Sequence, residues 1–234
     1  MKQTMAHSAK FHLRQAGFSL VEMAIVLLIV TLLLGGLLPA LSGQIDQQRR
    51  NDTRKQLDEI SAALLGYAAS QQPPRLPCPA NPALTTGSAN AGIADCTRTS
   101  GVIPWATLGT SETDAWGRRF TYSAASSVAG PFTTSFTLTS TGNINVLSKK
   151  SGGSNIATGV PAVVISHGPN GRGAYTPLGT QIAASTDPDE AENSDGSANL
   201  TRVSHDPTPT FDDLVIWLSP NTLFNRMVSA GRLP

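Results

Sequence analysis

One acidic side chain, Glu22, lies near the start of an otherwise uncharged apolar run from Phe18 to Leu41. A carboxylate inside such a run is expensive in a lipid bilayer, so it indicates a functional residue with a specific partner. The preceding pair Gly17-Phe18 offers that partner, because a cut between them would make Phe18 a free α-amine. The sequence therefore predicts cleavage after Gly17 and a charge pair between Glu22 and the new amine.

A second group of acidic residues lies late in the chain. Five carboxylates fall close together, at Asp187, Asp189, Glu190, Glu192 and Asp195. Dense oxygen ligands on an irregular loop suit Ca²⁺, although the run lacks the EF-hand spacing with its central glycine. A calcium site and a solvated acidic loop both stay open. Asp212 and Asp213 either join such a site or cap the entry to the last strand. We expect no other cofactor.

The chain has two cysteines, Cys78 and Cys96, and both follow the apolar run. In an oxidising compartment two such cysteines form a disulfide. A zinc site is disfavoured because the sequence has no C-x-x-C pair and no histidine close to either cysteine. We expect a Cys78–Cys96 bridge.

We expect that the protein is not an enzyme. Ser166 and His167 are adjacent, but the G-x-S-x-G elbow of hydrolases is absent from the sequence. Neighbouring residues on a strand also point to opposite faces, which would separate this pair. A set of acid, base and nucleophile is not evident elsewhere in the sequence.

The elements that must position Glu22 are a basic leader and a long helix. The leader, residues 1–17, carries Lys2, Lys10 and Arg14 and no acid, so the positive-inside rule keeps it in the cytoplasm. As a helix, residues 18–41 cover about 36 Å, enough to span a bilayer. Within this span, three residues are predicted points of bending: Gly35, Gly36 and Pro39.

Two other fates of the N-terminus stay open. The segment Ala40-Leu41-Ser42 resembles the cleavage site of a secretory signal peptide, but this apolar region is long for such a signal and contains an acid. An uncut membrane anchor explains the length of the run and leaves Glu22 unexplained. The first residue of the mature protein separates the three, since it is Phe18, Gly43 or the start of the intact leader.

The helix is expected to continue as an amphipathic half over residues 42–72. One apolar stripe recurs at three- and four-residue steps, at Leu57, Ile60, Leu64 and Tyr67. The prolines at 73 and 74 end the helix. Residues 73–234 then form a globular domain, with predicted strands at 119–123, 132–140, 144–147, 162–166 and 214–218. Segments 149–159 and 187–199 are predicted loops, and Ser219-Pro220 starts a terminal helix. A helix packed on a small antiparallel sheet is an α+β fold.

The positions of Gly17, Phe18 and Glu22 resemble the signal of type IV prepilins and type II secretion pseudopilins, in which the glutamate is the fifth mature residue. Pro39 also falls where many pilins carry a helix-loosening proline. The resemblance covers the leader and the N-terminal helix, and the globular domain shows a weaker likeness in its Asp114-Ala115-Trp116-Gly117 turn.

The resemblance implies a structural subunit, a minor pilin or pseudopilin, of a type IV pilus or a type II secretion pseudopilus. Its implied partners are a prepilin peptidase that cuts at Gly17 and methylates Phe18, an inner-membrane assembly platform and other pilin subunits. The protein would cross the inner membrane once, with a cytoplasmic N-terminus and a periplasmic globular domain, before entering a filament that can reach the cell surface. There Glu22 would pair with the Phe18 amine of a neighbouring subunit at low dielectric constant.

The charge balance disfavours nucleic-acid binding. The chain has 17 basic and 16 acidic residues, and removal of the leader leaves 14 basic and 16 acidic, a formal charge of −2. The doublets Arg118-Arg119 and Lys149-Lys150 are expected to be solvated loop charges. An alternative function is a pilus-associated binding protein, an adhesin or DNA receptor, with its specificity in the surface loops 80–100 and 176–206.

Overall fold

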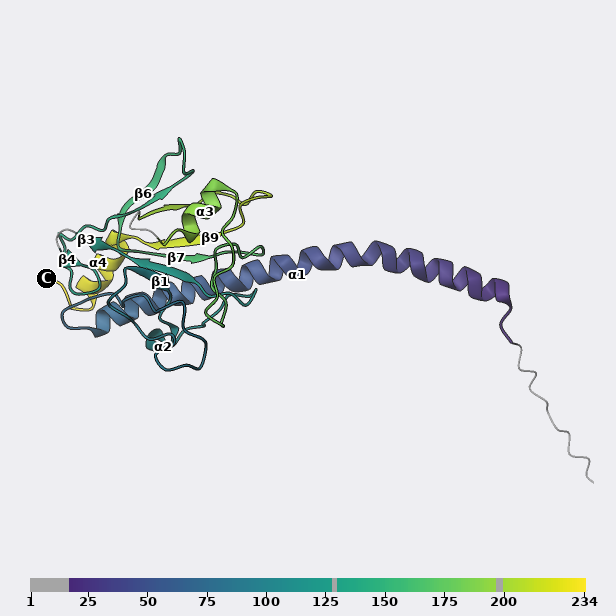
Figure 1. The fold of residues 1–234 in the computed structure, drawn as a ribbon, viewed down its shortest axis with the longest axis horizontal. Coiled ribbons are helices and arrows are strands. Elements are labelled where there is room, and N and C mark those ends of the chain that lie inside the picture. Colours follow the sequence, from purple (N-terminus) through teal and green to yellow (C-terminus); the bar gives the residue numbers. More distant parts are fainter. Residues whose placement is uncertain (1–16, 128–129, 197–199) are drawn as a thin grey trace, which may run out of the picture. The chain divides into compact units, whose positions relative to one another are not determined.

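The structure is a computed structural model that describes residues 17–127, 130–196 and 200–234, without the side chains of residues 34–42, 127, 130 and 131. The chain forms two compact units, Met1–Ile45 and Asp46–Pro234. Most of the predicted leader lies outside the described residues. The architecture is α+β, as predicted, and it combines four helices with three small sheets in the part of the chain that is described (Figure 1).

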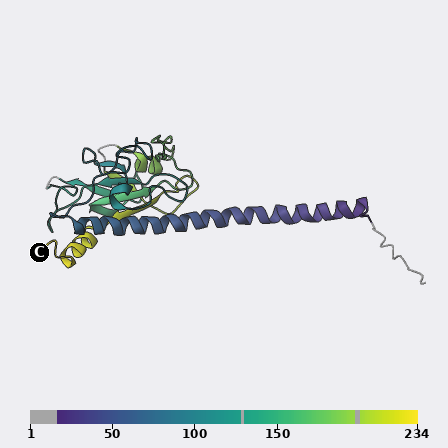
Figure 2. The same ribbon diagram turned by 90° about the horizontal axis from the view of Figure 1, so that it is seen from below.

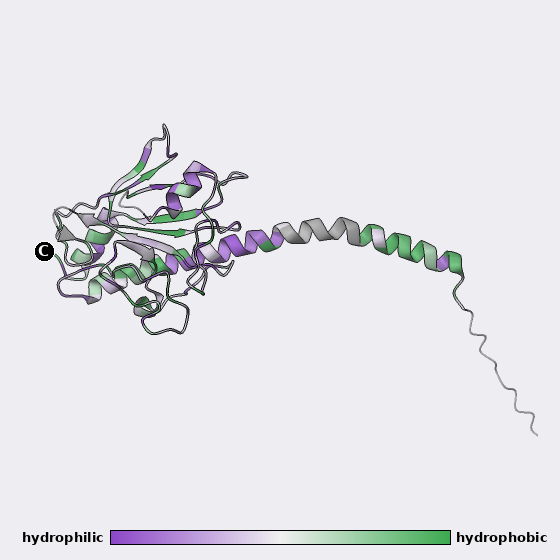
Figure 3. Cartoon of the chain, in the orientation of Figure 1, coloured by the Kyte–Doolittle hydropathy of each residue, from purple (hydrophilic) through white to green (hydrophobic). Residues whose placement is uncertain are grey.

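A long helix, α1 (Leu20–Ser70), begins two residues after the predicted start at Phe18. Its first part carries the apolar run, and the part that follows Gly43 begins with polar residues, a contrast that the hydropathy colours reproduce (Figure 3). The predicted bending points Gly35, Gly36 and Pro39 fall within α1 among residues 34–42, whose side chains are not described, so the bending stays a prediction.

The second half of α1 provides one face of the core of the globular unit. Its inward-facing residues are fully buried, at Leu57, Ile60, Leu64 and Ala68. Tyr67, which we predicted in this stripe, is half-buried, and Ala68 takes the inner position one residue later. Figure 2 shows this part of α1 lying along the sheet, with the C-terminal helix α4 (Pro220–Ser229) beside its end.

The main sheet is antiparallel with strand order β1-β2-β7-β9. Its strands are β1 (Ser100–Val102), β2 (Thr121–Ala124), β7 (Ala162–Ser166) and β9 (Leu214–Leu218). All five residues of β7 are buried, as expected for an apolar strand with neighbours on both sides. The predictions at 162–166 and 214–218 are confirmed, and the strand predicted at 119–123 lies slightly later.

A second sheet, with order β6-β5-β8, contains β5 (Ile144–Leu147), β6 (Asn155–Val160) and β8 (Thr201–Val203). Strand β5 pairs antiparallel with β6 and parallel with β8. The loop predicted at 149–159 is therefore wrong in its second half, because β6 begins at Asn155. A short hairpin, β3 (Ser126–Ser127) and β4 (Gly130–Pro131), forms the third sheet.

The strand predicted at 132–140 is wrong, because turns and irregular chain follow Pro131. Phe132 and Phe136 are buried and form an aromatic cluster with Phe224 of α4, with ring centroids 5.3 to 6.5 Å apart. The rings thus anchor a loop into the core, and the threonines between them gave a misleading strand propensity. The predicted terminal helix is confirmed as α4. A short helix, α2 (Trp105–Leu108), follows β1.

The loop between Cys78 and Cys96 is closed by the predicted disulfide. Arg119, which lies two residues before β2, contacts the same loop, and its side chain is fully buried. Its Nη1 donates to the carbonyl oxygens of Pro82 and Leu84 at 2.9 and 2.7 Å. The prediction that this arginine is a solvated loop charge is therefore wrong.

Candidate functional site

The residues of the predicted cleavage site lie immediately before α1. Residues 17–19 are not helical, and Phe18 is 82% exposed. A Cβ added at Gly17 would meet none of the described atoms within 4 Å, and its φ is not left-handed. The described chain thus has no internal need for glycine at position 17, so any requirement for it comes from a partner such as a peptidase.

Glu22 forms a reciprocal pair of hydrogen bonds with Ser19. The Ser19 N–H donates to Glu22 Oε2 at 2.9 Å, and the Glu22 N–H donates to Ser19 Oγ at 3.2 Å. This arrangement is a capping box, which satisfies free amides at the start of a helix. Our sequence analysis missed Ser19, although S-x-x-E before an apolar run is the signature of this box. Phe18 is joined to Gly17 in this structure, so its nitrogen is an amide.

The first half of α1 exposes its large apolar side chains between Leu20 and Leu33. Residues 34–41 of the predicted membrane span lie outside the described side chains. Over what is described, no helix combines the length and the apolarity that crossing a bilayer requires. A continuous apolar surface of this size on one unit is typical of a surface that other helices or lipid cover.

Three carboxylates converge at a second place, in the globular unit. Glu190 lies on α3 (Pro188–Ser194), and Asp212 and Asp213 lie just before β9. One oxygen from each lies within 4.8 Å of the others. Glu190 and Asp213 are buried and Asp212 is half-buried, so the group is largely removed from water.

Each of these carboxylates has one oxygen held by a donor and one without a hydrogen-bond partner. Asn170 donates to Glu190 Oε1 through its side chain at 2.7 Å and to Asp212 Oδ2 through its backbone at 3.1 Å. Asn193 donates to Asp213 Oδ2 at 2.8 Å. The other three oxygens, Glu190 Oε2, Asp212 Oδ1 and Asp213 Oδ1, are buried and unpartnered. Buried polar atoms normally have hydrogen-bond partners, so three such oxygens in one group are unusual.

Burial and neighbouring carboxylates both disfavour the charged form of Asp212. Burial, and then the negative charges of Glu190 and Asp213, raise the pKa of Asp212 to about 6. The hydrogen bond from Asn170 and the positive charge of Arg50 on α1 oppose this shift. A cation among the three carboxylates would offset their repulsion.

His167 and the turn that follows it form one wall of the carboxylate group. The His167 Nδ1 atom lies 3.6 Å from Asp213 Oδ1 and has no hydrogen-bond partner. Gly168 has φ +54°, and a Cβ there would lie 2.3 Å from the Asp212 backbone oxygen. Arg118 Nη1 donates to the carbonyl oxygens of Gly168 and Pro169 at 2.9 Å. Glycine therefore allows the turn to approach Asp212, and the guanidinium fixes it there.

Of the five acids predicted as a calcium loop, Glu190 joins the carboxylate group and the other four lie elsewhere. Asp187 caps α3 and Glu192 forms an ion pair with Lys150 Nζ at 2.8 Å. Asp189 accepts from the Lys150 amide, and Asp195 follows the last residue of α3. The segment is partly helical, so the prediction of a loop at 187–199 is wrong over α3. Asp187-Pro188 is an N-cap followed by a first-turn proline, a signal that we missed.

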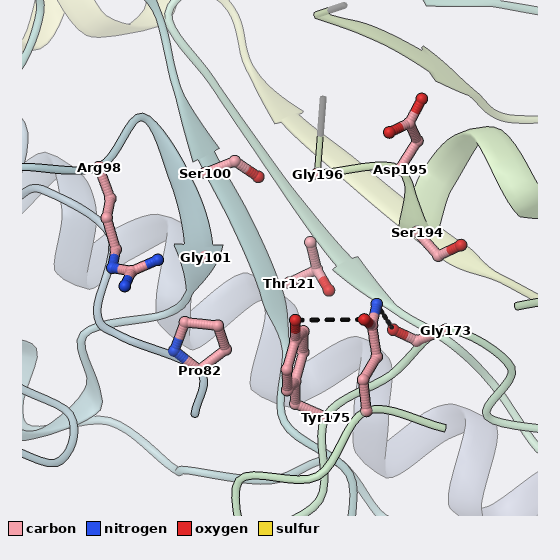
Figure 4. A pocket seen from close by; sticks show the side chains of 11 residues that line it. Pro82, Arg98, Ser100, Gly101, Thr121, Gly173, Tyr175, Ser194, Asp195 and Gly196 are labelled. Atoms are coloured by element: carbon pink, nitrogen blue, oxygen red, sulfur yellow. Dashed lines mark hydrogen bonds between the residues drawn. The ribbon is translucent and has the colours of Figure 1, made fainter. Parts of the chain in front are cut away.

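A polar cavity of about 230 Å³ lies between the two loops named for the alternative binding function (Figure 4). Arg98 and Asp195 lie on opposite sides of it. Tyr175 Oη donates to Gln181 Oε1 at 3.2 Å, and Gln181 Nε2 donates to the Gly173 carbonyl at 3.1 Å. Its central polar groups are thus bonded to one another, and we assign no ligand to the cavity.

Ser166 and His167 are both buried but take separate partners. The Ser166 hydroxyl donates to Asp114 Oδ2 at 2.7 Å, and burial raises the pKa of Asp114. His167 Nε2 lies 2.8 Å from Thr121 Oγ1. The adjacent serine and histidine therefore serve the packing of two turns and do not form a nucleophile and base.

Comparison with known protein families finds a match at the N-terminus. Residues 12–38 match the prokaryotic N-terminal methylation motif. No curated protein and no solved structure matches the chain. The matched segment includes Gly17, Phe18 and Glu22, and the prediction of a type IV prepilin-like signal is confirmed.

Proposed function

We propose that the chain is the precursor of a filament subunit, a minor pilin or pseudopilin of a type IV pilus or a type II secretion pseudopilus. The observation that carries this proposal is the N-terminal methylation motif at residues 12–38. The exposed and non-helical Gly17-Phe18 junction supports it, because a peptidase must reach that bond. The exposed apolar surface of α1 supports burial of this helix against lipid first and other subunits later.

In the proposed sequence of events the chain inserts in the inner membrane with its leader in the cytoplasm. A prepilin peptidase cuts after Gly17 and methylates the new amine of Phe18. The assembly platform then transfers the subunit into a filament, where Glu22 pairs with the amine of a neighbour. The globular unit stays on the periplasmic side and faces the filament surface.

The Gly17→Val substitution is expected to block the cut, because the bulky side chain enters the space that the peptidase occupies. The fold tolerates it, since a Cβ at this position meets no described atom within 4 Å. The measurement is the intact mass of the protein extracted from membranes that contain a prepilin peptidase. Wild type should begin at Phe18, and the variant should keep its leader.

A matched control is Gly66→Val, since Gly66 on α1 also has no described atom near its added Cβ. This variant should be cut as wild type is. A wild-type protein that begins at Gly43, or that keeps its leader beside an active peptidase, contradicts the proposed function.

We also propose that Glu190, Asp212 and Asp213 bind a divalent cation, with Ca²⁺ as the first candidate. Two observations support this site: each carboxylate offers one oxygen within 4.8 Å of the others, and each has one buried oxygen without a hydrogen-bond partner. Ca²⁺ takes six to eight oxygen ligands at flexible geometry, so three carboxylates and added waters suit it better than they suit the stricter Mg²⁺. This set replaces the five-residue acidic loop as the proposed site.

Ca²⁺ is expected to raise the unfolding temperature of the detergent-solubilised full chain relative to EDTA. A ligand at a hundred times its Kd stabilises the folded state by about 2.7 kcal/mol, which is several degrees for a domain of this size. The Asp213→Asn variant should lose most of this response, because it removes one charge from the site. Differential scanning calorimetry with and without Ca²⁺ measures it.

Asp189→Asn is the matched control, since Asp189 lies on the same helix outside the carboxylate group and bonds the Lys150 amide. It should keep the full response to Ca²⁺. An equal response in Asp213→Asn and Asp189→Asn, or no response in wild type, contradicts the site.

A further inference from the structure

Helix α1 has a sharply defined start at Ser19. The Met23 N–H donates to the Ser19 carbonyl oxygen at 3.2 Å, which makes Ser19 the N-cap residue. The two capping-box bonds with Glu22 then satisfy an amide on each residue. Phe18 and Gly17 precede this cap and are outside the helix.

The position of this start matters because peptide bonds inside a helix are poorly accessible to a peptidase. Helical backbone groups bond to one another, so a helical segment cannot align with the cleft of a peptidase. Apart from Glu22, the residues that immediately follow Ser19 are apolar and can adopt helical backbone, and so can Phe18. A cap at position 19 is the feature that stops the helix before the junction.

We propose that Ser19 is a positioning residue for the cut between Gly17 and Phe18. Its capping box with Glu22 fixes the first helical residue at Leu20 and keeps the scissile amide in non-helical backbone. This inference rests on the proposed function, since it concerns the same cut. In that reaction water adds to the Gly17 carbonyl carbon and the Phe18 nitrogen takes a proton, which leaves a carboxylate and an amine. Ser19 takes no part in the bond changes.

The same geometry gives Glu22 two successive partners. Before the cut its carboxylate accepts from the Ser19 amide. The cut creates a charged amine at Phe18, which is a stronger donor than a neutral amide. A positive charge at a helix N-terminus is also unfavourable, so the amine gains from pairing with a carboxylate. The cut thus converts Glu22 from a capping residue into a residue available for assembly.

The test is the rate of leader removal from the full chain in membranes that contain the prepilin peptidase, followed by pulse-chase and mass spectrometry. The Ser19→Ala variant removes the cap and introduces the strongest helix former. We expect it to be cut about five-fold more slowly, the factor that loss of a typical N-cap gives. The Ser19→Thr and Ser19→Asn variants keep a capping oxygen and should be cut within about two-fold of the wild-type rate.

Glu22→Gln separates the cap from the charge, because glutamine serves equally in a capping box. It should be cut at close to the wild-type rate, and equal membrane insertion of all variants is measured alongside. A wild-type rate for Ser19→Ala, or an equally slow cut of Ser19→Thr, overturns the role of Ser19 and leaves the proposed function intact. A wild-type chain that is never cut after Gly17 overturns both.

Discussion

A Glu22→Val chain should insert in the membrane and lose its leader, but it should be nearly absent from filaments. In the proposed assembly the Phe18 amine of one subunit enters a low-dielectric core of packed helices, where it needs a carboxylate from its neighbour. Valine leaves that amine unpaired, and a buried charge that has lost its partner is strongly unfavourable. We expect about ten-fold or greater loss of the subunit from the filament fraction. The measurement is an immunoblot of sheared filaments against membranes.

The Glu22→Gln variant separates the charge of Glu22 from its role in the cap, because glutamine keeps the capping hydrogen bonds and loses the charge. It should fail in assembly as Glu22→Val does. Glu59→Gln is the matched control, since Glu59 is an exposed acid of α1 in the globular unit. Wild-type amounts of Glu22→Gln in filaments would show that the charge does not act in assembly.

The processing residues were predictable because their signal is local. Gly17, Phe18 and Glu22 lie within six residues, and an acid in an apolar run stands out in any sequence. Ser19 carries an equally local signal in S-x-x-E, but the apolar surroundings of Glu22 point first to a charged partner, which would exist only after the proposed cut. The structure pairs Glu22 with Ser19.

The carboxylate group was harder to predict because it depends on tertiary structure. Glu190 lies more than twenty residues before Asp212, and the two meet because α3 turns Glu190 inward beside the entry to β9. An acidic run alone cannot show which of its members points inward. In the structure Glu190 joins the carboxylate group. Asp187 instead caps α3, and the buried Glu192 pairs with Lys150.

The sequence predicted the core strand that is buried on both faces. It failed at 132–140, where a loop supplies aromatic side chains to the core. Strand β7 is a short apolar run, and such a run has few alternatives to the centre of a sheet. Phe132 and Phe136 are four residues apart, a spacing that would place both rings on one face of a strand, so the sequence favours a strand where the chain is in fact irregular. Both rings pack against Phe224, about ninety residues later, a contact that the local sequence does not reveal.

An Arg119→Met substitution is expected to destabilise the globular unit strongly. The guanidinium has 0% exposure and joins three segments, through Glu112 at 2.8 Å, the Leu84 carbonyl at 2.7 Å and the Pro177 carbonyl at 3.1 Å. Methionine fills similar space but removes the positive partner of Glu112 and the donor to the Leu84 carbonyl. Thr86 still donates to Glu112 and to the Pro177 carbonyl. Removal of one partner from a buried ion pair costs about 3–5 kcal/mol. Urea unfolding of the detergent-solubilised full chain, followed by tryptophan fluorescence, measures the loss.

The free energy of unfolding of Arg119→Lys should lie between those of wild type and Arg119→Met. Lysine keeps the charge but lacks the planar guanidinium, which reaches several oxygens at once. Arg98→Met is the matched control. Arg98 is partly exposed and pairs with Asp95 in the loop that Cys78 and Cys96 close, so its loss should cost no more than about 1 kcal/mol.

Reduction of the disulfide gives a second test of the role of Arg119. Pro82 and Leu84, which accept hydrogen bonds from Arg119, lie between Cys78 and Cys96, so the covalent bridge and the guanidinium hold the same loop. Two restraints on one loop are not independent, and each should matter more when the other is missing. Reduction should therefore destabilise Arg119→Met more than it destabilises wild type. Two results would contradict this role of Arg119. One is an equal loss of unfolding free energy on reduction in wild type and in Arg119→Met, and the other is an equal urea midpoint for Arg119→Met and Arg98→Met. Either would mean that packing holds the loop and that the buried charge does not.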